Sequence, residues 1–273
     1  MDYVEPVKLV EQLIAVGKKK AKLRIRDMLL RGILSGVLLG FATALAFKVS
    51  DGFVGGAASL VAGVIFPVGF VMIVLLGLEL VTGSFAILPM SVADGKVSLK
   101  EMGRNWGWVF LGNLLGSVFF GLLLVVALTG ASPDAGALGN KIIAIALAKT
   151  AAYQNAGLMG WFTAFVKGVL CNWMVTVGTV LGMVSTSTIG KTIPPWLPIT
   201  TFFALGFEHA VVNMFVIPTA MFLGADISLY QWLFWNQIPV TLGNLVGGAI
   251  FTGMFLYATY GPAGKPVKLG VVE

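Results

Sequence analysis

Residues 196–222 read WLPITTFFALGFEHAVVNMFVIPTAMF, an apolar run that carries Glu208 and His209 near its centre. A bilayer core about 30 Å thick is crossed by roughly 20 apolar residues in a helix, so this run is long enough to span a membrane. A carboxyl group and an imidazole inside such a run are costly unless they are paired, protonated or face a cavity. The stretch therefore predicts a membrane span that is interrupted at membrane depth.

A second break of the same kind occurs earlier in the chain, and it belongs to a longer repeat. Three motifs occur twice in the same order, at offsets of 136, 129 and 131 positions. They are Arg31-Gly32-Ile33-Leu34 and Lys167-Gly168-Val169-Leu170, Gly77-Leu78-Glu79 and Gly206-Phe207-Glu208, and Leu111-Gly112-Asn113 and Leu242-Gly243-Asn244. Each copy holds three predicted spans, an odd number, so the second copy must enter the membrane from the opposite face. The sequence therefore predicts an inverted repeat, with the transport path at the interface of its two halves.

The composition agrees with this class. Of 273 residues, 58% are hydrophobic and only 11% are charged, against about 25% charged in soluble domains. We expect an all-α membrane protein with six spans, the second and fifth of them interrupted, near residues 31–48, 58–90, 106–130, 161–184, 196–222 and 236–260. The predicted layout is an N-terminal segment 1–30, a channel domain 31–260 with repeats at about 31–130 and 161–260, and a tail 261–273. A soluble enzyme is excluded.

The basic residues indicate the orientation. Fourteen of them lie in the N-terminal segment, the 91–104 connection, Lys191 and the C-terminus, against three in the loops of the opposite face. Positive residues concentrate on the cytoplasmic side, so both termini are expected in the cytoplasm of a cell-membrane protein. The net charge of +6 is thereby explained without a nucleic-acid partner. Residues 6–20 have the amphipathic pattern of a short helix on the membrane surface.

The ionisable residues in the breaks are the first candidates for a site. Glu79 and Glu208 could hold the broken helices by accepting hydrogen bonds from orphaned backbone N–H groups, or could contact a substrate directly. His209 is the only histidine, and imidazole exchanges a proton near neutral pH, so a proton-transfer role competes with simple packing. One histidine and one cysteine, Cys171, make no metal-ligand set, and no metal or cofactor is expected.

Small polar and aromatic side chains near the breaks complete the set. Thr82 and Asn213 suit the wall of a narrow passage, while Asn172 fits either that wall or a hydrogen bond between helices. Three phenylalanines on the predicted cytoplasmic side of the breaks could close the path by excluding water. They are Phe66, Phe70 and Phe202.

Together these motifs resemble the formate/nitrite transporter family over about residues 5–260. The resemblance is carried by Phe66-Pro67-Val68-Gly69, Gly77-Leu78-Glu79-Leu80-Val81-Thr82-Gly83, Gly168-Val169-Leu170-Cys171-Asn172-Trp173, Gly206-Phe207-Glu208-His209 and Asn213-Met214-Phe215-Val216-Ile217-Pro218. It implies a homopentamer in which each protomer holds an aquaporin-like pore.

The same resemblance implies roles for individual residues. His209 would be the central residue, hydrogen-bonded to Thr82, and Lys149 would attract anions at the outer mouth. Phe66, Phe70 and Phe202 would form the cytoplasmic constriction. The outer constriction would consist of Leu80, Val81 and Val175, although the family usually has phenylalanine at the position of Val81.

The expected function is the passage of formate, nitrite or a similar small anion, with protonation at His209 because the neutral acid crosses an apolar constriction more cheaply than the anion. A pore for neutral solutes such as water or glycerol, and a hydrosulfide channel, remain alternatives. An intramembrane enzyme would need a nucleophile or metal beside its base. Only a Ser84–His209 pair offers one, and neither His-Glu-x-x-His nor Gly-x-Ser-x-Gly occurs.

Overall fold

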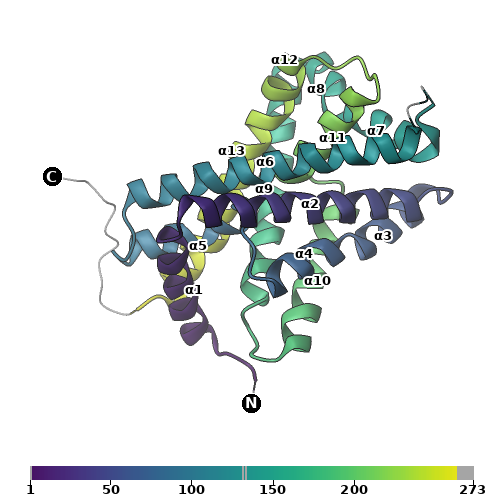
Figure 1. Cartoon of the computed structure of the whole chain (residues 1–273). Coiled ribbons are helices and arrows are strands. Elements are labelled where there is room, and N and C mark those ends of the chain that lie inside the picture. Colours follow the sequence, from purple (N-terminus) through teal and green to yellow (C-terminus); the bar gives the residue numbers. More distant parts are fainter. Residues whose placement is uncertain (1, 131, 133, 263–273) are drawn as a thin grey trace.

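The computed structural model describes residues 2–130, 132 and 134–262, and these form a bundle of helices (Figure 1). Most of the predicted tail 261–273 therefore lies outside the described residues. The elements in chain order are α1 Pro6–Ala21, α2 Ile25–Val49, α3 Gly55–Ile65, α4 Pro67–Leu75, α5 Val81–Ala93, α6 Leu99–Thr129, α7 Gly136–Lys149, α8 Ala151–Asn155, α9 Gly157–Leu181, α10 Thr188–Ala204, α11 Ala210–Phe222, α12 Leu229–Trp232, the π-helical η1 Leu233–Gln237, α13 Ile238–Val246, the π-helical η2 Gly247–Met254 and α14 Phe255–Tyr260.

Two pairs of parallel helices pack through glycine. In the first pair, α2 and α6 run side by side (Figure 1), and a Cβ built on Gly32 would lie 3.1 Å from the Cα of Gly112. In the second pair, α9 and α13 meet in the same way, and a Cβ on Gly168 would lie 3.2 Å from the Cα of Gly243. Lipid chains are as apolar as leucine, so close backbone packing at small residues is what holds such helices together.

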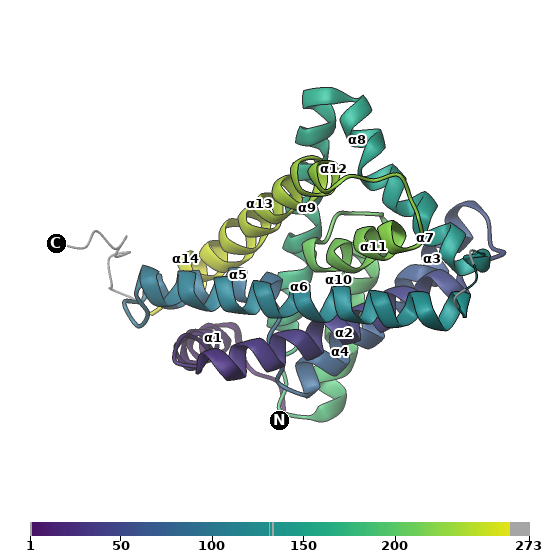
Figure 2. The same ribbon diagram turned by 45° about the horizontal axis from the view of Figure 1, so that its top comes forward.

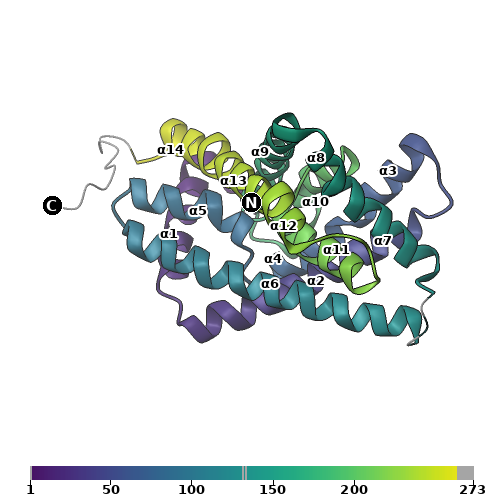
Figure 3. The ribbon, with the colours of Figure 1, turned by 90° about the horizontal axis from the view of Figure 1, so that it is seen from above.

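Within the described part of the chain, five helical segments are long and apolar enough to cross a membrane. They are residues 25–49, 55–75, 99–129, 157–181 and 229–260. The shorter apolar helices α5 and α11 lie between α6 and the α13 segment (Figure 3). Each follows a non-helical stretch of five residues, 76–80 or 205–209. These stretches coincide with the two predicted breaks, and Gly77 and Gly206 adopt positive φ angles of 61° and 67° there.

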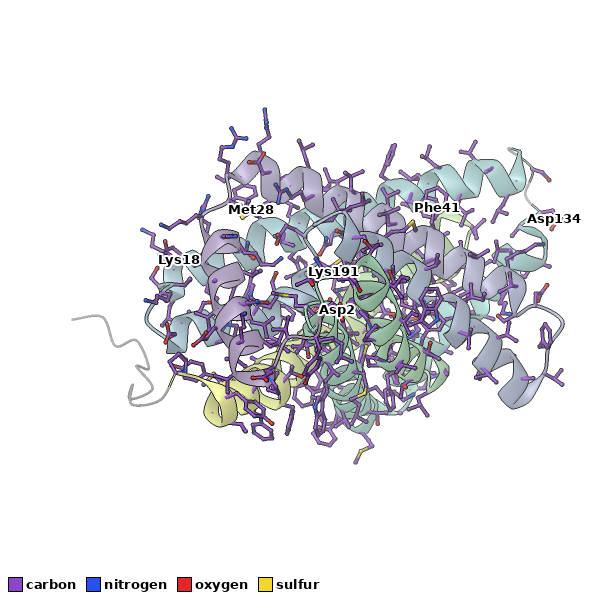
Figure 4. The ribbon with its side chains drawn as sticks, turned by 90° about the horizontal axis from the view of Figure 1, so that it is seen from below. Asp2, Lys18, Met28, Phe41, Asp134 and Lys191 are labelled. Carbon is purple, nitrogen blue, oxygen red and sulfur yellow. The ribbon has the colours of Figure 1, made fainter. Side chains whose placement is uncertain are left out.

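The N-terminal segment is attached to the bundle. Helix α1 covers the predicted amphipathic stretch and packs on α5. Ahead of it, the Val4 N–H donates to the Val184 carbonyl at 2.8 Å, and the Thr186 N–H donates to the Asp2 carbonyl at 3.0 Å. Figure 4 accordingly places Asp2 close to Lys191, near the start of α10.

The connection between the repeats is more ordered than the sequence analysis predicted. Residues 136–155 form helices α7 and α8, between the predicted spans 106–130 and 161–184, where the sequence analysis placed no element. Helix α7 packs against α11 and leads through α8 to α9 (Figure 2). This arrangement brings the C-terminal end of α7 to the second break.

Candidate functional site at the two helix breaks

The first break is held by an asparagine from a neighbouring helix. Asn113, on α6, accepts a hydrogen bond from the Val81 N–H at 3.0 Å through its Oδ1. Its Nδ2 donates to the carbonyls of Glu79 at 3.0 Å and Gly32 at 2.9 Å. Backbone groups freed by the end of a helix must find partners in an apolar environment. One amide side chain serves two such groups here, those of Val81 and Glu79, and ties them to the carbonyl of Gly32 within α2.

The second break has the same arrangement. Asn244, on α13, accepts from the Ala210 N–H at 2.9 Å and donates to the carbonyls of Glu208 at 2.9 Å and Gly168 at 2.8 Å. Each of these four residues corresponds to one in the first break through the sequence repeat. The site prediction omitted both asparagines, although their repeated Leu-Gly-Asn motif was visible in the sequence.

The carboxylate of Glu79 does not support its loop in the way that was predicted. It is buried and accepts two hydrogen bonds from the Lys20 ammonium, at 2.8 and 2.9 Å. A carboxylate in an apolar interior requires a counter-charge, and Lys20 supplies it. The backbone of the loop is bonded by Asn113 and not by the Glu79 carboxylate. The pair borders a first cavity of about 280 Å³, which Arg31 also lines.

Glu208 occupies the equivalent place in the second break, with more partners. Its carboxylate accepts hydrogen bonds from the Lys149 ammonium at 2.7 Å, the Tyr153 hydroxyl at 2.8 Å and the Asn213 amide at 2.7 Å. Lys149, the last residue of α7, therefore reaches the site and forms an ion pair with Glu208. The group borders a second cavity of about 410 Å³ that Lys167 also lines.

His209 lies between the two cavities. Its Nδ1 accepts a hydrogen bond from the Val212 N–H at 3.2 Å, and its Nε2 lies 3.1 Å from Oγ1 of Thr82. Because Nδ1 is an acceptor, the proton of a neutral imidazole sits on Nε2 and is directed at Thr82. His209 lines the second cavity, whereas Leu80 and Gly83, which flank Thr82, line the first. The Thr82–His209 contact thus spans the wall between the cavities.

The two other polar candidates face backbone or network groups. The Asn172 amide donates to the carbonyls of Thr82 at 3.1 Å and Asn244 at 2.6 Å, which favours the interhelical role. Asn213 donates to Glu208 and to Asn236, so it belongs to the carboxylate network.

One aromatic ring, that of Phe202, packs on the histidine. The rings of Phe66 and Phe202 meet edge to face with centroids 5.7 Å apart, and the Phe202 ring stacks on His209 at 5.8 Å. Phe70 is buried beside the first cavity. Leu80, Val81 and Val175 are also buried.

The cavities do not fit the predicted sides of two constriction residues, Phe202 and Leu80, whereas Phe70 lines the first cavity with Lys20, as its predicted side requires. Phe202 was assigned to the cytoplasmic side, yet it lines the second cavity together with Lys149, the predicted outer residue. Leu80 was assigned to the outer side, yet it lines the first cavity together with Lys20, from the basic N-terminal segment. Each glutamate forms an ion pair with a lysine at its own break, Lys20 with Glu79 and Lys149 with Glu208. The first pair lines the first cavity and the second pair lines the second cavity.

A bundle of apolar helices with two buried ion pairs, and with a hydrogen-bonded histidine between two cavities, defines a membrane transport protein. Residues 7–258 match the model of the formate/nitrite transporter family, and the chain belongs to that family. It is an integral membrane protein of a transporter and channel family.

Individual relatives agree with this assignment. The chain is 36% identical to a probable formate transporter of Methanothermobacter thermautotrophicus, over 94% of this chain and 97% of that protein. It is 38% identical to a formate channel of Haemophilus influenzae, over 81% and 84% of the two chains. Among solved structures, an ion channel of the same family superposes with a TM-score of 0.79 at 25% identity, covering 92% of this chain and 98% of that one. A pentameric formate channel with formate bound superposes with a TM-score of 0.73 at 29% identity, covering 86% and 97%.

Proposed function

We propose that this protein is a channel for formate, and for chemically similar monovalent anions such as nitrite, across a cell membrane. The observation that carries the proposal is the Thr82–His209 contact between two cavities, each bordered by a lysine–glutamate pair. The formate-transporting relatives support the choice of substrate. A pore for a neutral solute alone would not need buried ion pairs on both sides of its centre.

Protonation at the centre would lower the barrier to permeation. A bare anion loses its hydration at the apolar walls formed by residues such as Phe202 and Leu80, which is far more costly than moving the neutral acid. The Nε2–H of His209 is directed at the Thr82 hydroxyl oxygen, so the hydroxyl proton of Thr82 is free to be donated to the permeating anion. A proton from water on the entry side would pass through His209 and Thr82 to the anion, which restores the neutral imidazole. The resulting acid would cross the apolar constrictions and release its proton on the other side, which couples the anion to a proton.

The proposed architecture is an inverted repeat whose second and fifth spans are interrupted, assembled as a homopentamer. Support comes from the matched sets of three hydrogen bonds made by Asn113 and Asn244 and from the matched pairs Lys20–Glu79 and Lys149–Glu208. The charge distribution supports cytoplasmic termini, which would make the first cavity the cytoplasmic vestibule. The relative solved as a pentamer supports the assembly.

The test is uptake into proteoliposomes that contain the purified protein, followed by stopped-flow light scattering. We expect formate and nitrite to enter much faster than they enter protein-free vesicles, and glycerol to enter no faster. Free passage of glycerol with exclusion of both anions would overturn the proposal in favour of a neutral-solute pore. Passage of hydrosulfide with exclusion of formate would instead indicate a hydrosulfide channel.

A further inference from the structure

The second cavity is lined by three lysines that are held very differently. Lys149 is bound to the Glu208 carboxylate. Lys141 donates two hydrogen bonds at 3.0 Å, to the Phe47 carbonyl and to the Ser50 hydroxyl. Lys167 differs from both, because no carboxylate in the described part of the chain lies within ion-pair distance of its ammonium group.

The position of Lys167 brings this ammonium group to the break that contains the histidine. Lys167 lies on α9, and its carbonyl accepts a hydrogen bond from the Glu208 N–H at 3.3 Å. Its Nζ stands 5.8 Å from the centroid of the Tyr153 ring, over the same network that holds Glu208. The charges of Lys149 and Glu208 largely cancel, so the field that an anion meets on its way to His209 comes from Lys167 and Lys141, and Lys141 already donates two hydrogen bonds to protein oxygens.

The first cavity independently contains the same arrangement of a paired lysine and a cation without a carboxylate partner. In the sequence repeat, Arg31-Gly32 corresponds to Lys167-Gly168. Arg31 lines the first cavity, in which Lys20 is paired with Glu79. No carboxylate of the described residues lies within ion-pair distance of Arg31 either. Beside the lysine used by a glutamate, each cavity therefore has a cation from the same position of the repeat that no described carboxylate pairs with. Lys141 also lines the second cavity, where it is bound to neutral oxygens, and Lys19 also lines the first.

We propose that Lys167 is the anion-binding residue of the second cavity and that the ammonium of Lys149 serves to hold Glu208. The ligand is a small monovalent oxyanion, either a monocarboxylate or nitrite, whose oxygens accept hydrogen bonds from Nζ before the ligand reaches His209. This inference rests on the proposed channel function. It separates the capture of the anion from its protonation, and it assigns the two steps to different residues.

The test measures initial rates of formate uptake against formate concentration, in proteoliposomes at low ionic strength. Lys167→Gln should raise the half-saturating concentration about two- to fivefold, as expected for one cation acting through a water-filled cavity, and should leave the maximal rate nearly unchanged. Lys167→Arg should behave like the wild type. The matched control is Lys48→Gln, which removes one positive charge from an exposed position that does not line this cavity.

Two further measurements keep the test decisive. Lys167→Met retains the aliphatic stem beside Tyr153, so it replaces the glutamine variant if that variant fails to elute as a pentamer. For the wild type, the half-saturating concentration should rise with ionic strength because salt screens the attraction.

Several results would overturn the inference. These are equal half-saturation for Lys167→Gln and Lys48→Gln, a loss of maximal rate alone, failure of Lys167→Arg to retain the wild-type value, or no salt dependence in the wild type. If the wild type transports neither formate nor nitrite, the proposed function fails. If it transports them and Lys167→Gln changes nothing, only the role of Lys167 fails.

Discussion

His209 makes hydrogen bonds through both ring nitrogens, so its role can be tested by a substitution that keeps polarity and removes the titratable proton. His209→Asn should still fold, because asparagine can accept from the Val212 N–H. It should lose the increase in formate uptake at low external pH and the accompanying inward flow of protons. The measurement is acidification of a pH-sensitive dye inside vesicles. Undiminished, equally pH-dependent acidification would show that the histidine is only a hydrogen-bonding wall.

Asn244 tests how the breaks are held. Asn244→Ala removes three hydrogen bonds at once, and at the break it leaves the Ala210 N–H and the Glu208 carbonyl without this partner. Each buried polar group left unpaired costs about 1–3 kcal/mol, so a marked fall in the melting temperature in detergent is expected. The control is Asn140→Ala, at an exposed position. Equal melting temperatures for the two variants would contradict the role of Asn244.

Among individual residues, the sequence predicted those whose chemistry is unusual in an apolar span. Glu79, Glu208 and His209 were selected as candidates in this way, and His209 lies 3.1 Å from Thr82, the neighbour that the resemblance implied. Lys20 was not linked to Glu79, because a basic residue before the first span has a sufficient explanation as a topology signal. Such pairing depends on how α1 folds back onto α5, which local sequence does not encode.

At the scale of elements, the attachment of the N-terminal segment should depend on Asp2. Hydrogen bonds from Ser187 and Ser185 lower the pKa of the Asp2 carboxyl below its ordinary value. A carboxylate with a lowered pKa in the folded state stabilises the attachment above its unfolded pKa, near 4, and this contribution is lost as the pH falls through the folded value.

Asp2→Asn should therefore speed hydrogen exchange at the amides of Val4 and Thr186 at pH 7. After correction for the intrinsic exchange rate, the difference from the wild type should shrink as the pH falls below about 4. Mass spectrometry of peptides that cover these amides gives the measurement. Identical exchange of the two proteins at pH 7 would show that the Asp2 side chain does not contribute.

Helix positions were predictable where hydrophobic runs are long and charges mark their ends. Non-helical stretches occur at 76–80 and 205–209, which contain Glu79 and Glu208. The sequence did not predict α7 and α8, because residues 136–155 form helices too short to stand out as membrane spans. The π-helical segments η1 and η2 were also missed. Their extra residue per turn leaves no distinct pattern of polar and apolar side chains.

For the whole molecule, the central prediction is its orientation. Lys18 and Asp134 lie at opposite ends of the molecule (Figure 4). If the N-terminus is cytoplasmic, an impermeant maleimide applied to intact cells should label Asp134→Cys but not Lys18→Cys. The native Cys171 is buried and should add little background. Labelling of Lys18→Cys alone would reverse the orientation and, with it, the assignment of the two cavities.

The asparagines that hold the breaks also have a consequence for the synthesis of the protein. Asn113 follows Val81 by 32 positions, and Asn244 follows Ala210 by 34. The chain is made from its N-terminus, so each loop is synthesised before the side chain that satisfies its backbone. A released chain that ends between Ala210 and Asn244 would carry His209, Thr82 and the residues of both ion pairs, yet its second loop would lack the asparagine that bonds its backbone. Such unfinished chains should be recognised by membrane quality-control proteases rather than accumulate as leaky half-formed pores.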